Sequence, residues 1–182
     1  MRLIDLPIEG PKWLLPTVHA DARGYFYESF NERDFARALG APARFVQDNH
    51  SLSLRGTLRG LHYQQTRPQG KLVRVIRGAA FDVVVDLRAG SASYGRHIGV
   101  TLSADDKRQL WIPPGFAHGF LALADEVELL YKVTEYRDAA DERAIRWSDP
   151  QLAIAWPLSG EPLLSDKDRH APSFLEAQPI GV

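Results

Sequence analysis

Short segments rich in β-branched and aromatic residues follow one another roughly every ten residues through the middle of the chain. Gly78 and Ala79 divide the first of these segments into two runs, which predicts a hairpin over 71–88. Glycine, proline and aspartate, which favour turns, stand between the segments. Many short strands at this spacing predict a β-sandwich or barrel. The segments lie at 71–88, 96–102, 108–113, 119–124 and 127–136.

One helix is predicted ahead of these strands. Asn31 can cap its start, and Asp34, three residues later, supplies the carboxylate of an arrangement like a capping box. Phe35 and Leu39 lie on one face of the helix, and Gly40 is a suitable residue to end it. The chain therefore belongs to a mainly β class with a few short helices.

No repeat, low-complexity tract or linker divides the 182 residues, so we expect a single domain over 1–182. Its barrel core spans about 45–137, and residues 1–44 add N-terminal strands and the helix. Residues 150–182 form a tail that we expect to run extended over the barrel, with one helical turn at 165–170.

The composition excludes several classes of protein. Without cysteine the chain can hold no disulfide, thiolate zinc site or iron–sulfur cluster and offers no thiol nucleophile. Its formal net charge of −1 gives no global basic field for nucleic acid or an anionic membrane, although a local anion site is compatible with it. No apolar run reaches the roughly 20 residues that span a bilayer, and acidic residues and prolines come too early for a secretory signal. We expect a soluble cytoplasmic protein with neither nucleic acid nor membrane as partner.

The segment PPGFAHGF contains His118 at a spacing that resembles the second motif of the cupin superfamily, where a histidine lies at the mouth of a small antiparallel barrel. The alternative is a hairpin turn followed by a histidine that faces the core. A metal-binding cupin also needs a first motif with two histidines two apart and a nearby glutamate. The candidate here has His62 followed by Gln64. Only two candidate histidine ligands remain, so we expect no catalytic metal.

The segment FVQDNHSLSLRGTLRGLHYQ is too polar for a half-buried pair of strands unless its polar face lines a site. Arg55 and Arg59 each precede a glycine, which lets the backbone come close while the guanidinium binds phosphate oxygens. The alternative is a solvated loop with ordinary ion pairs. We favour a site, because Gln47, Asn49, Arg59 and His62 can in part share one face of a strand.

Three other features leave two interpretations open. In DARGYFYESF, Arg23 and Glu28 can face an anionic polyhydroxyl ligand, or the segment is an edge strand with Phe26 inward. Tyr131 is either a core residue with a satisfied hydroxyl or a proton donor. Residues 166–168 have the composition of a solvated, charged turn.

Taken together, six segments resemble the dTDP-4-dehydrorhamnose 3,5-epimerase family, a cupin-type family of deoxysugar biosynthesis. They stand in the family's order and spacing and cover nearly all of residues 20–170. The six segments read DARGYFYESF, FVQDNHSLSLRGTLRGLHYQ, QGKLVRVIRGAAFDVVVDLR, LWIPPGFAHGFLAL, LLYKV and LSDKD.

The resemblance implies a cupin-type antiparallel barrel (a jelly roll) and an isomerase that works without a cofactor. Its reaction epimerises C3 and C5 of dTDP-4-dehydro-6-deoxy-D-glucose to give dTDP-4-dehydro-L-rhamnose, on the way to dTDP-L-rhamnose for cell-surface polysaccharides. A proton α to the C4 ketone is removed and returned to the other face. The resemblance assigns His62 as the base, Asp168 as its orienting carboxylate, Tyr131 as the opposite acid and Lys71 as the cation at the enolate oxygen.

The resemblance also implies substrate contacts and a homodimer in which exchanged N-terminal strands bring Arg23 and Glu28 to the neighbouring site. Arg137 departs from the family, which commonly has an aromatic residue there that stacks on thymine, although an arginine can also stack on a base. Asp82 and Asp86 share a strand face and receive no role. The implied contact residues are Arg23, Phe26, Glu28, Gln47, Asn49, Arg59, Lys71, His118, Arg137, Glu142 and Lys167.

Two alternatives use the same site. One is an epimerase that inverts a single carbon, C3 or C5, of a related nucleotide-linked 4-ketosugar. The other is a cupin that binds a sugar nucleotide without catalysis. A metal-dependent oxygenase is disfavoured by Gln64.

Overall fold

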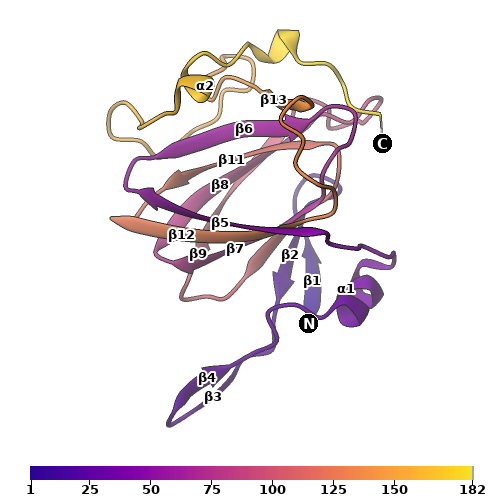
Figure 1. The fold of residues 1–182 in the computed structure, drawn as a ribbon, viewed down its shortest axis with the longest axis vertical. Coiled ribbons are helices and arrows are strands. Elements are labelled where there is room, and N and C mark those ends of the chain that lie inside the picture. Colours follow the sequence, from indigo (N-terminus) through magenta and orange to yellow (C-terminus); the bar gives the residue numbers. More distant parts are fainter. Residues whose placement is uncertain (182) are drawn as a thin grey trace.

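Two antiparallel sheets face each other in the computed structural model, which describes residues 1–181 (Figure 1). The first sheet has six strands, in the spatial order β1 (Arg2–Asp5), β2 (Lys12–Leu15), β10 (Gln109–Ile112), β7 (Lys71–Arg77), β12 (Glu126–Val133) and β5 (Gln47–Leu54). The second has five, in the order β13 (Glu142–Ala144), β6 (Leu58–Gln64), β11 (Phe116–Ala122), β8 (Ala79–Asp86) and β9 (His97–Ser103).

The sheets are held together by apolar side chains that point between them. Val73 and Leu129 of the first sheet belong to the same buried cluster as Val84 and Phe120 of the second. Burial of such side chains is the main force that favours the folded barrel. The predicted class, a mainly β antiparallel barrel, is confirmed. Its few helical turns are α1 (Glu32–Leu39), α2 (Asp166–Arg169) and the 3-10 turn η1 (Phe174–Glu176).

The predicted hairpin over 71–88 is wrong in its pairing, although both strands exist. β7 pairs with β10 and β12 in the first sheet, whereas β8 pairs with β9 and β11 in the second. Gly78, with a φ of +74°, is the one residue between them and carries the chain from sheet to sheet. The commonest hairpin turns have two residues, so a single glycine between apolar runs is weak evidence for pairing.

The helix forms where it was predicted. The side chain of Asn31 accepts a hydrogen bond from the N–H of Asp34, and Gly40 ends the helix in the left-handed conformation. The carboxylate of Asp34 pairs with Arg37 at 3.4 Å rather than completing a capping box. Phe35 is fully buried and packs edge-on against Trp111, which fastens α1 to the first sheet.

The tail crosses the second sheet largely in extended form, as predicted, and α2 forms the expected helical turn (Figure 1). Leu152 and Ile180 pack in one buried cluster with Val83 and Val85 of β8. The tail thus buries the outer face of the second sheet and brings α2 beside β6.

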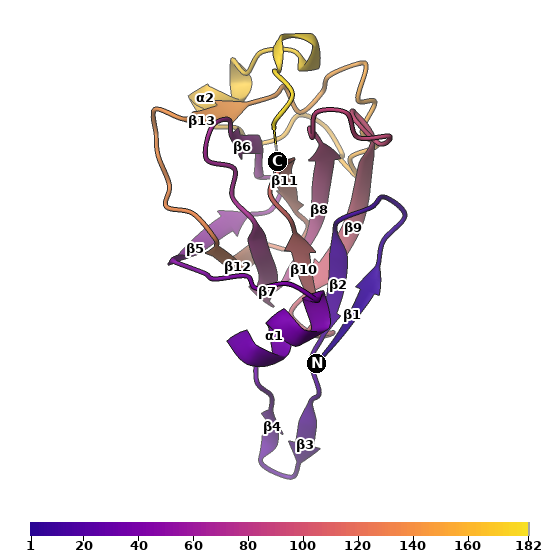
Figure 2. The ribbon, with the colours of Figure 1, turned by 90° about the vertical axis from the view of Figure 1, so that its right-hand side faces the viewer.

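A separate hairpin projects from the barrel on the side of the N-terminus (Figures 1 and 2). It consists of β3 (His19–Asp21) and β4 (Gly24–Phe26), which pair only with each other. Tyr25 and Phe26 are 60% and 69% exposed on this arm. The arm therefore carries an aromatic surface that its own barrel leaves uncovered.

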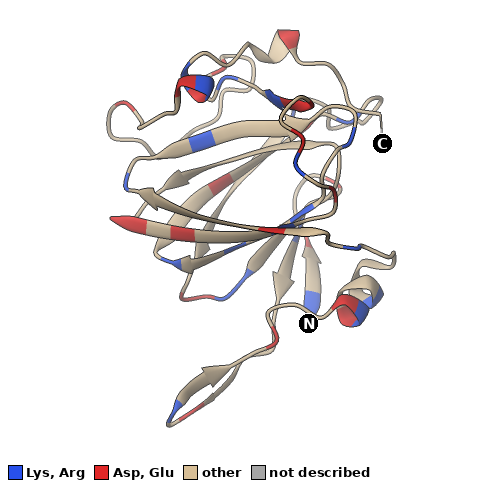
Figure 3. Cartoon of the chain, in the orientation of Figure 1, with Lys and Arg blue, Asp and Glu red and all other residues tan. Residues whose placement is uncertain are grey.

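Figure 3 shows basic and acidic residues interspersed along residues 1–181. No helix in this part of the chain is both long and apolar enough to cross a membrane.

An irregularity in β6 shapes the interior of the barrel. Opposite β11, His62 faces His118 and Arg59 faces Phe120, so three steps along β6 match two along β11. One extra residue in a strand reverses the alternation of its side chains. Arg59 and His62 therefore line the same cavity although they are three residues apart.

Gly60 lies at this bulge with a φ of +120°. A Cβ there would lie 2.6 Å from the Cα of Gly119 and 2.7 Å from the carbonyl oxygen of His118, and both of these are backbone atoms. The two backbones approach more closely here than any side chain permits, so the bulge requires glycine.

We expect Gly60→Ala to lower the free energy of unfolding far more than Gly56→Ala. Gly56 also has a positive φ, +78°, but open space surrounds it. The control should lose about 1 kcal/mol from backbone strain. Gly60→Ala must also separate two strands and should lose on the order of 3 kcal/mol or more. Urea unfolding measures both, and equal losses would contradict this account of the bulge.

Candidate functional site

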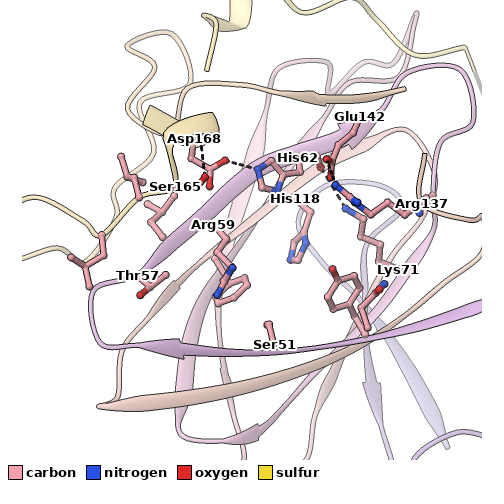
Figure 4. Close-up of a pocket in the computed structure, with 17 residues that line it drawn as sticks. Ser51, Thr57, Arg59, His62, Lys71, His118, Arg137, Glu142, Ser165 and Asp168 are labelled. Carbon is pink, nitrogen blue, oxygen red and sulfur yellow. Dashed lines mark hydrogen bonds and ion pairs between the residues drawn. The ribbon is translucent and has the colours of Figure 1, made fainter. Parts of the chain in front are cut away.

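A cavity of about 440 Å³ opens between the two sheets beneath α2 (Figure 4). Both sheets, the loops and the tail contribute to its wall. The lining residues are Asn49, Ser51, Lys71 and Tyr131 from the first sheet, Leu58, Arg59, His62, His118, Phe120 and Glu142 from the second, and Thr57, Gln69, Arg137, Leu163, Leu164, Ser165 and Asp168 from loops and tail.

The imidazole of His62 is bonded to the carboxylate of Asp168 (Figure 4). His62 Nε2 lies 2.5 Å from Asp168 Oδ1, and the two side chains are 28% and 3% exposed. Burial alone would raise the pKa of Asp168, but hydrogen bonds from His62 and Ser165 hold it below its ordinary value. An ionised carboxylate can only accept hydrogen bonds, so Nε2 carries a proton, and in the neutral imidazole Nδ1 has the free lone pair.

A second imidazole–carboxylate pair stands directly beside the first. His118 is the strand partner of His62, and its Nε2 lies 2.9 and 3.0 Å from the two carboxylate oxygens of Asp82. Asp82 is fully buried, so this contact gives it a role that the sequence left open: it orients the ring of His118. Asp86 on the same strand has a different role, because it accepts hydrogen bonds from Arg88 in the turn after β8.

Lys71 begins β7 and is only 7% exposed. Burial lowers its pKa to about 8, although the carboxylates of Glu142 and Asp82 counteract part of that effect. Its Nζ donates to the carbonyl oxygen of His62 at 3.4 Å. The cavity therefore contains a cation near neutral pH that becomes a neutral amine in mild alkali.

Tyr131 reaches the cavity from β12 in the first sheet, whereas His62 comes from β6 in the second. Burial and the charge of Glu142 raise the pKa of the phenol, so it stays protonated at neutral pH and can donate a proton. The phenol and the imidazole thus approach the cavity from opposite walls.

Glu142 joins two cations at the cavity rim. One of its oxygens lies 2.7 Å from Lys167 Nζ and 2.9 Å from a terminal nitrogen of Arg137. Burial would raise the pKa of Glu142, but these two partners hold it at about 2. The ionised carboxylate fixes both cations at the cavity mouth and also favours the charged form of Lys71.

Gln47 does not line the cavity but positions two residues that do, Asn49 and Arg137. Its Nε2 donates to Asn49 Oδ1 at 2.8 Å, and its Oε1 accepts the backbone N–H of Arg137 at 3.2 Å. The amide oxygen of Asn49 is thereby engaged, and its N–H groups are left for the cavity.

Most of the predicted site residues line this cavity. Gln47 and Lys167 lie beside it, bonded to the lining residues Asn49 and Glu142, and four residues lie away from it. Arg23 and Phe26 lie on the projecting arm, and Glu28 follows it. Arg55 pairs with Asp125 at 2.9 Å, away from the cavity. The structure leaves these residues outside the site of their own chain.

Sequence reasoning missed several polar residues of the cavity wall. Ser51 could have been found, because it alternates with Asn49 along β5. Ser165, which accepts the N–H of Asp168, is recognisable only once α2 is known to be a capped turn. Thr57, which forms an isolated bridge with Leu163, and Gln69 lie in connections between strands and carry no pattern.

Gln64, at the position that would hold a second metal-binding histidine, has a structural role. Its amide donates to the carbonyl oxygens of Arg67 at 2.8 Å and Tyr136 at 3.2 Å and accepts the N–H of Asp138 at 2.8 Å. It thereby holds the loop that carries Arg137. Within residues 1–181, no three His, Cys, Asp or Glu side chains are grouped so that they could hold a metal ion.

The cavity combines a base with a fixed tautomer, a phenol on the opposite wall and a buried cation. This set suits proton removal from a carbon whose charge moves to a neighbouring oxygen, and proton return from the other side.

Comparison with known proteins gives a consistent result. Residues 5–176 match the family model described as dTDP-4-dehydrorhamnose 3,5-epimerase. The dTDP-4-dehydrorhamnose 3,5-epimerase of Pseudomonas aeruginosa is 56% identical over 177 residues, which cover 97% of this chain and 98% of that protein. The dTDP-4-dehydrorhamnose 3-epimerase of Streptomyces niveus is 43% identical over 183 residues, covering 100% and 88%.

A solved structure also resembles the chain closely. The dTDP-6-deoxy-D-glucose-3,5-epimerase of Legionella pneumophila, in complex with dTDP-4-keto-L-rhamnose, superposes with a TM-score of 0.93 at 47% identity. The match covers 96% of this chain and 93% of that one.

We expect the Lys71 ammonium to titrate near pH 8, and Glu142→Gln to lower that midpoint, because Glu142 favours the charged form. Nitrogen-15 NMR of the lysine side chains measures it. Glu128→Gln, which removes a carboxylate that pairs with His50, should leave the midpoint unchanged. A Lys71 midpoint that stays constant in Glu142→Gln would refute the coupling.

Proposed function

The chain belongs to the dTDP-4-dehydrorhamnose 3,5-epimerase family and is an isomerase, and we propose that this cavity inverts C3 and C5 of dTDP-4-dehydro-6-deoxy-D-glucose without a cofactor. The family membership confirms the resemblance drawn from the sequence and the cupin-type barrel. One observation carries the proposal: His62, oriented by Asp168, faces the cavity from the wall opposite Tyr131.

In the proposed reaction, Nδ1 of His62 takes a proton from the carbon next to the C4 ketone. The electrons of the broken C–H bond move into the ketone and give an enolate. The cationic form of Lys71 stabilises the negative oxygen. Tyr131 then returns a proton to the opposite face of the carbon, and solvent restores the protonation of both residues.

Asp168 supports this chemistry in two ways. It fixes the tautomer that presents Nδ1, and its charge stabilises the imidazolium that forms when His62 accepts the proton. Asp82 fixes His118 at the neighbouring position, where the imidazole can contact the sugar.

The diphosphate of the substrate requires cations, which Arg59 supplies at the cavity and Lys167 at its rim. Arg137 occupies the position where the family resemblance places a base-stacking residue, and a guanidinium can stack on thymine. The ligand in the complex of the Legionella relative, dTDP-4-keto-L-rhamnose, carries such a diphosphate.

The remaining predicted contacts, Arg23, Phe26 and Glu28, reach a site only in a homodimer. Their arm projects from its own barrel and exposes Tyr25 and Phe26. A second copy of the chain would cover these rings and receive Arg23 and Glu28 at its cavity. We propose that the enzyme is a cytoplasmic homodimer. Its product is an intermediate in the synthesis of dTDP-L-rhamnose for cell-surface polysaccharides.

The second candidate function is inversion of C3 alone. It is favoured by the Streptomyces niveus relative, which is named a 3-epimerase and matches the whole chain. The positions that exchange with solvent distinguish the two functions, and binding without exchange would indicate a non-catalytic sugar-nucleotide-binding protein.

We expect incubation of dTDP-4-dehydro-6-deoxy-D-glucose with the protein in D₂O to place deuterium at C3 and C5, as followed by proton NMR. His62→Ala should lose exchange at both carbons by about 10³-fold, because the base is absent. Tyr131→Phe should keep part of the exchange but lose inversion, because only the returning acid is removed.

The matched control for that experiment is His50→Ala, which removes a histidine that pairs with Glu128 on the outer face of β5. It should exchange at the wild-type rate. Absence of exchange with wild-type protein would overturn the proposed function, and full inversion by Tyr131→Phe would remove Tyr131 from the mechanism.

Subunit mixing tests the homodimer. If Arg23 acts in the neighbouring site, a dimer of one His62→Ala and one Arg23→Ala chain has one intact site and one doubly altered site. Refolding the two inactive variants together should therefore recover about a quarter of wild-type activity, because half of the dimers are mixed. No recovery would place Arg23 in its own chain's site, and an Arg23→Ala variant that is active by itself would place Arg23 outside the machinery.

A further inference from the structure

The hydroxyl of Ser51 is buried without a hydrogen-bond partner in residues 1–181. Its Oγ exposes less than 1 Å², and it is the one buried side-chain polar atom of this part of the chain in that condition. An unbonded buried hydroxyl lowers stability, so such a group calls for an explanation. Ser51 lines the cavity, and Figure 4 shows it rising from β5 toward the interior.

Ser51 has three polar neighbours on this wall, Asn49, Ser53 and Arg59. Along β5 it stands between Asn49 and Ser53, on the inward face that alternate residues share. Ser53 Oγ accepts from Arg59 Nε at 3.0 Å, and the carbonyl oxygen of Leu52 accepts from Arg59 Nη2 at 3.1 Å. The strand thus holds the guanidinium in place, and its Nη1 has no partner among the described residues.

Three groups on this wall therefore have donors to offer: the amide of Asn49, the hydroxyl of Ser51 and the guanidinium of Arg59. A row of donors that ends in a fixed positive charge suits oxygens of an anion. Tyr131 lies opposite Asn49, at one end of this row, whereas Leu129 lies opposite Ser51, so no acid–base group is the strand partner of Ser51.

We infer that Ser51 is a substrate-binding residue whose hydroxyl donates to a phosphate oxygen of the diphosphate beside Arg59. This inference rests on the proposed function and adds a contact to it. The O–H can turn about the Cα–Cβ bond from the wall to the cavity when an acceptor arrives. The unbonded hydroxyl of Ser51 destabilises the free protein, and the hydrogen bond to the ligand removes that penalty.

Calorimetric titration with dTDP and with thymidine tests the assignment, because only dTDP has the phosphates. Ser51→Ala should weaken dTDP binding about tenfold, the effect of one hydrogen bond to a charged group, and leave thymidine binding unchanged. Ser51→Thr keeps the hydroxyl and should retain most of the affinity for dTDP. With the full substrate, Ser51→Ala should raise KM and leave kcat near the wild-type value.

Three results would overturn the inference. They are an unchanged dTDP affinity in Ser51→Ala, an equal loss of thymidine affinity, or a fall in kcat at constant KM, which would assign the hydroxyl to the sugar. The melting temperature of free Ser51→Ala should not fall, whereas a structural role predicts a lower one. Wild-type protein that binds no dTDP would overturn the proposed function as well, so the two failures are distinguishable.

Discussion

The hydrogen bond between His62 and Asp168 is the interaction on which the site depends, because it joins parts of the chain 106 residues apart. The tail reaches this point because it is fixed at the start of β6. Leu58 N donates to the carbonyl oxygen of Leu163 at 3.0 Å, and Leu163 N donates to that of Gly56 at 2.9 Å. The folded pKa of Asp168 lies below its ordinary value, so the bond stabilises the docked tail at neutral pH and is lost in acid.

The opposed sheets solve the geometric problem of epimerisation. A single wall can hold either a base or an acid near a given carbon, but inversion requires one on each side. Here β6 presents an imidazole from the second sheet, and β12 presents a phenol from the first. One carboxylate has two electrostatic roles. Glu142 pairs with the rim cations Arg137 and Lys167, and its charge favours the charged form of the buried Lys71.

The sequence predicted the strands, the helix and most of the cavity residues, because each depends on local patterns. Asn31 and Gly40 mark helix ends through their own side chain or backbone, and β-branched runs mark strands. It failed where the answer depends on distant contacts. Gly78 reads as a hairpin turn but connects two sheets, and Asp82 acquires its role only because β8 lies beside β11. Asp168 looked like a solvated residue, and only the family resemblance paired it with His62.

The central claim is that Asp168 holds His62 as a base with Nδ1 free toward the cavity. The most direct measurement is the tautomer of His62 in the free protein at neutral pH, read from the nitrogen-15 shifts of its two ring nitrogens. The account predicts a proton on Nε2, bonded to Asp168, and an unprotonated Nδ1. A proton on Nδ1 with a bare Nε2 would contradict it, because the lone pair would then face the carboxylate and not the substrate.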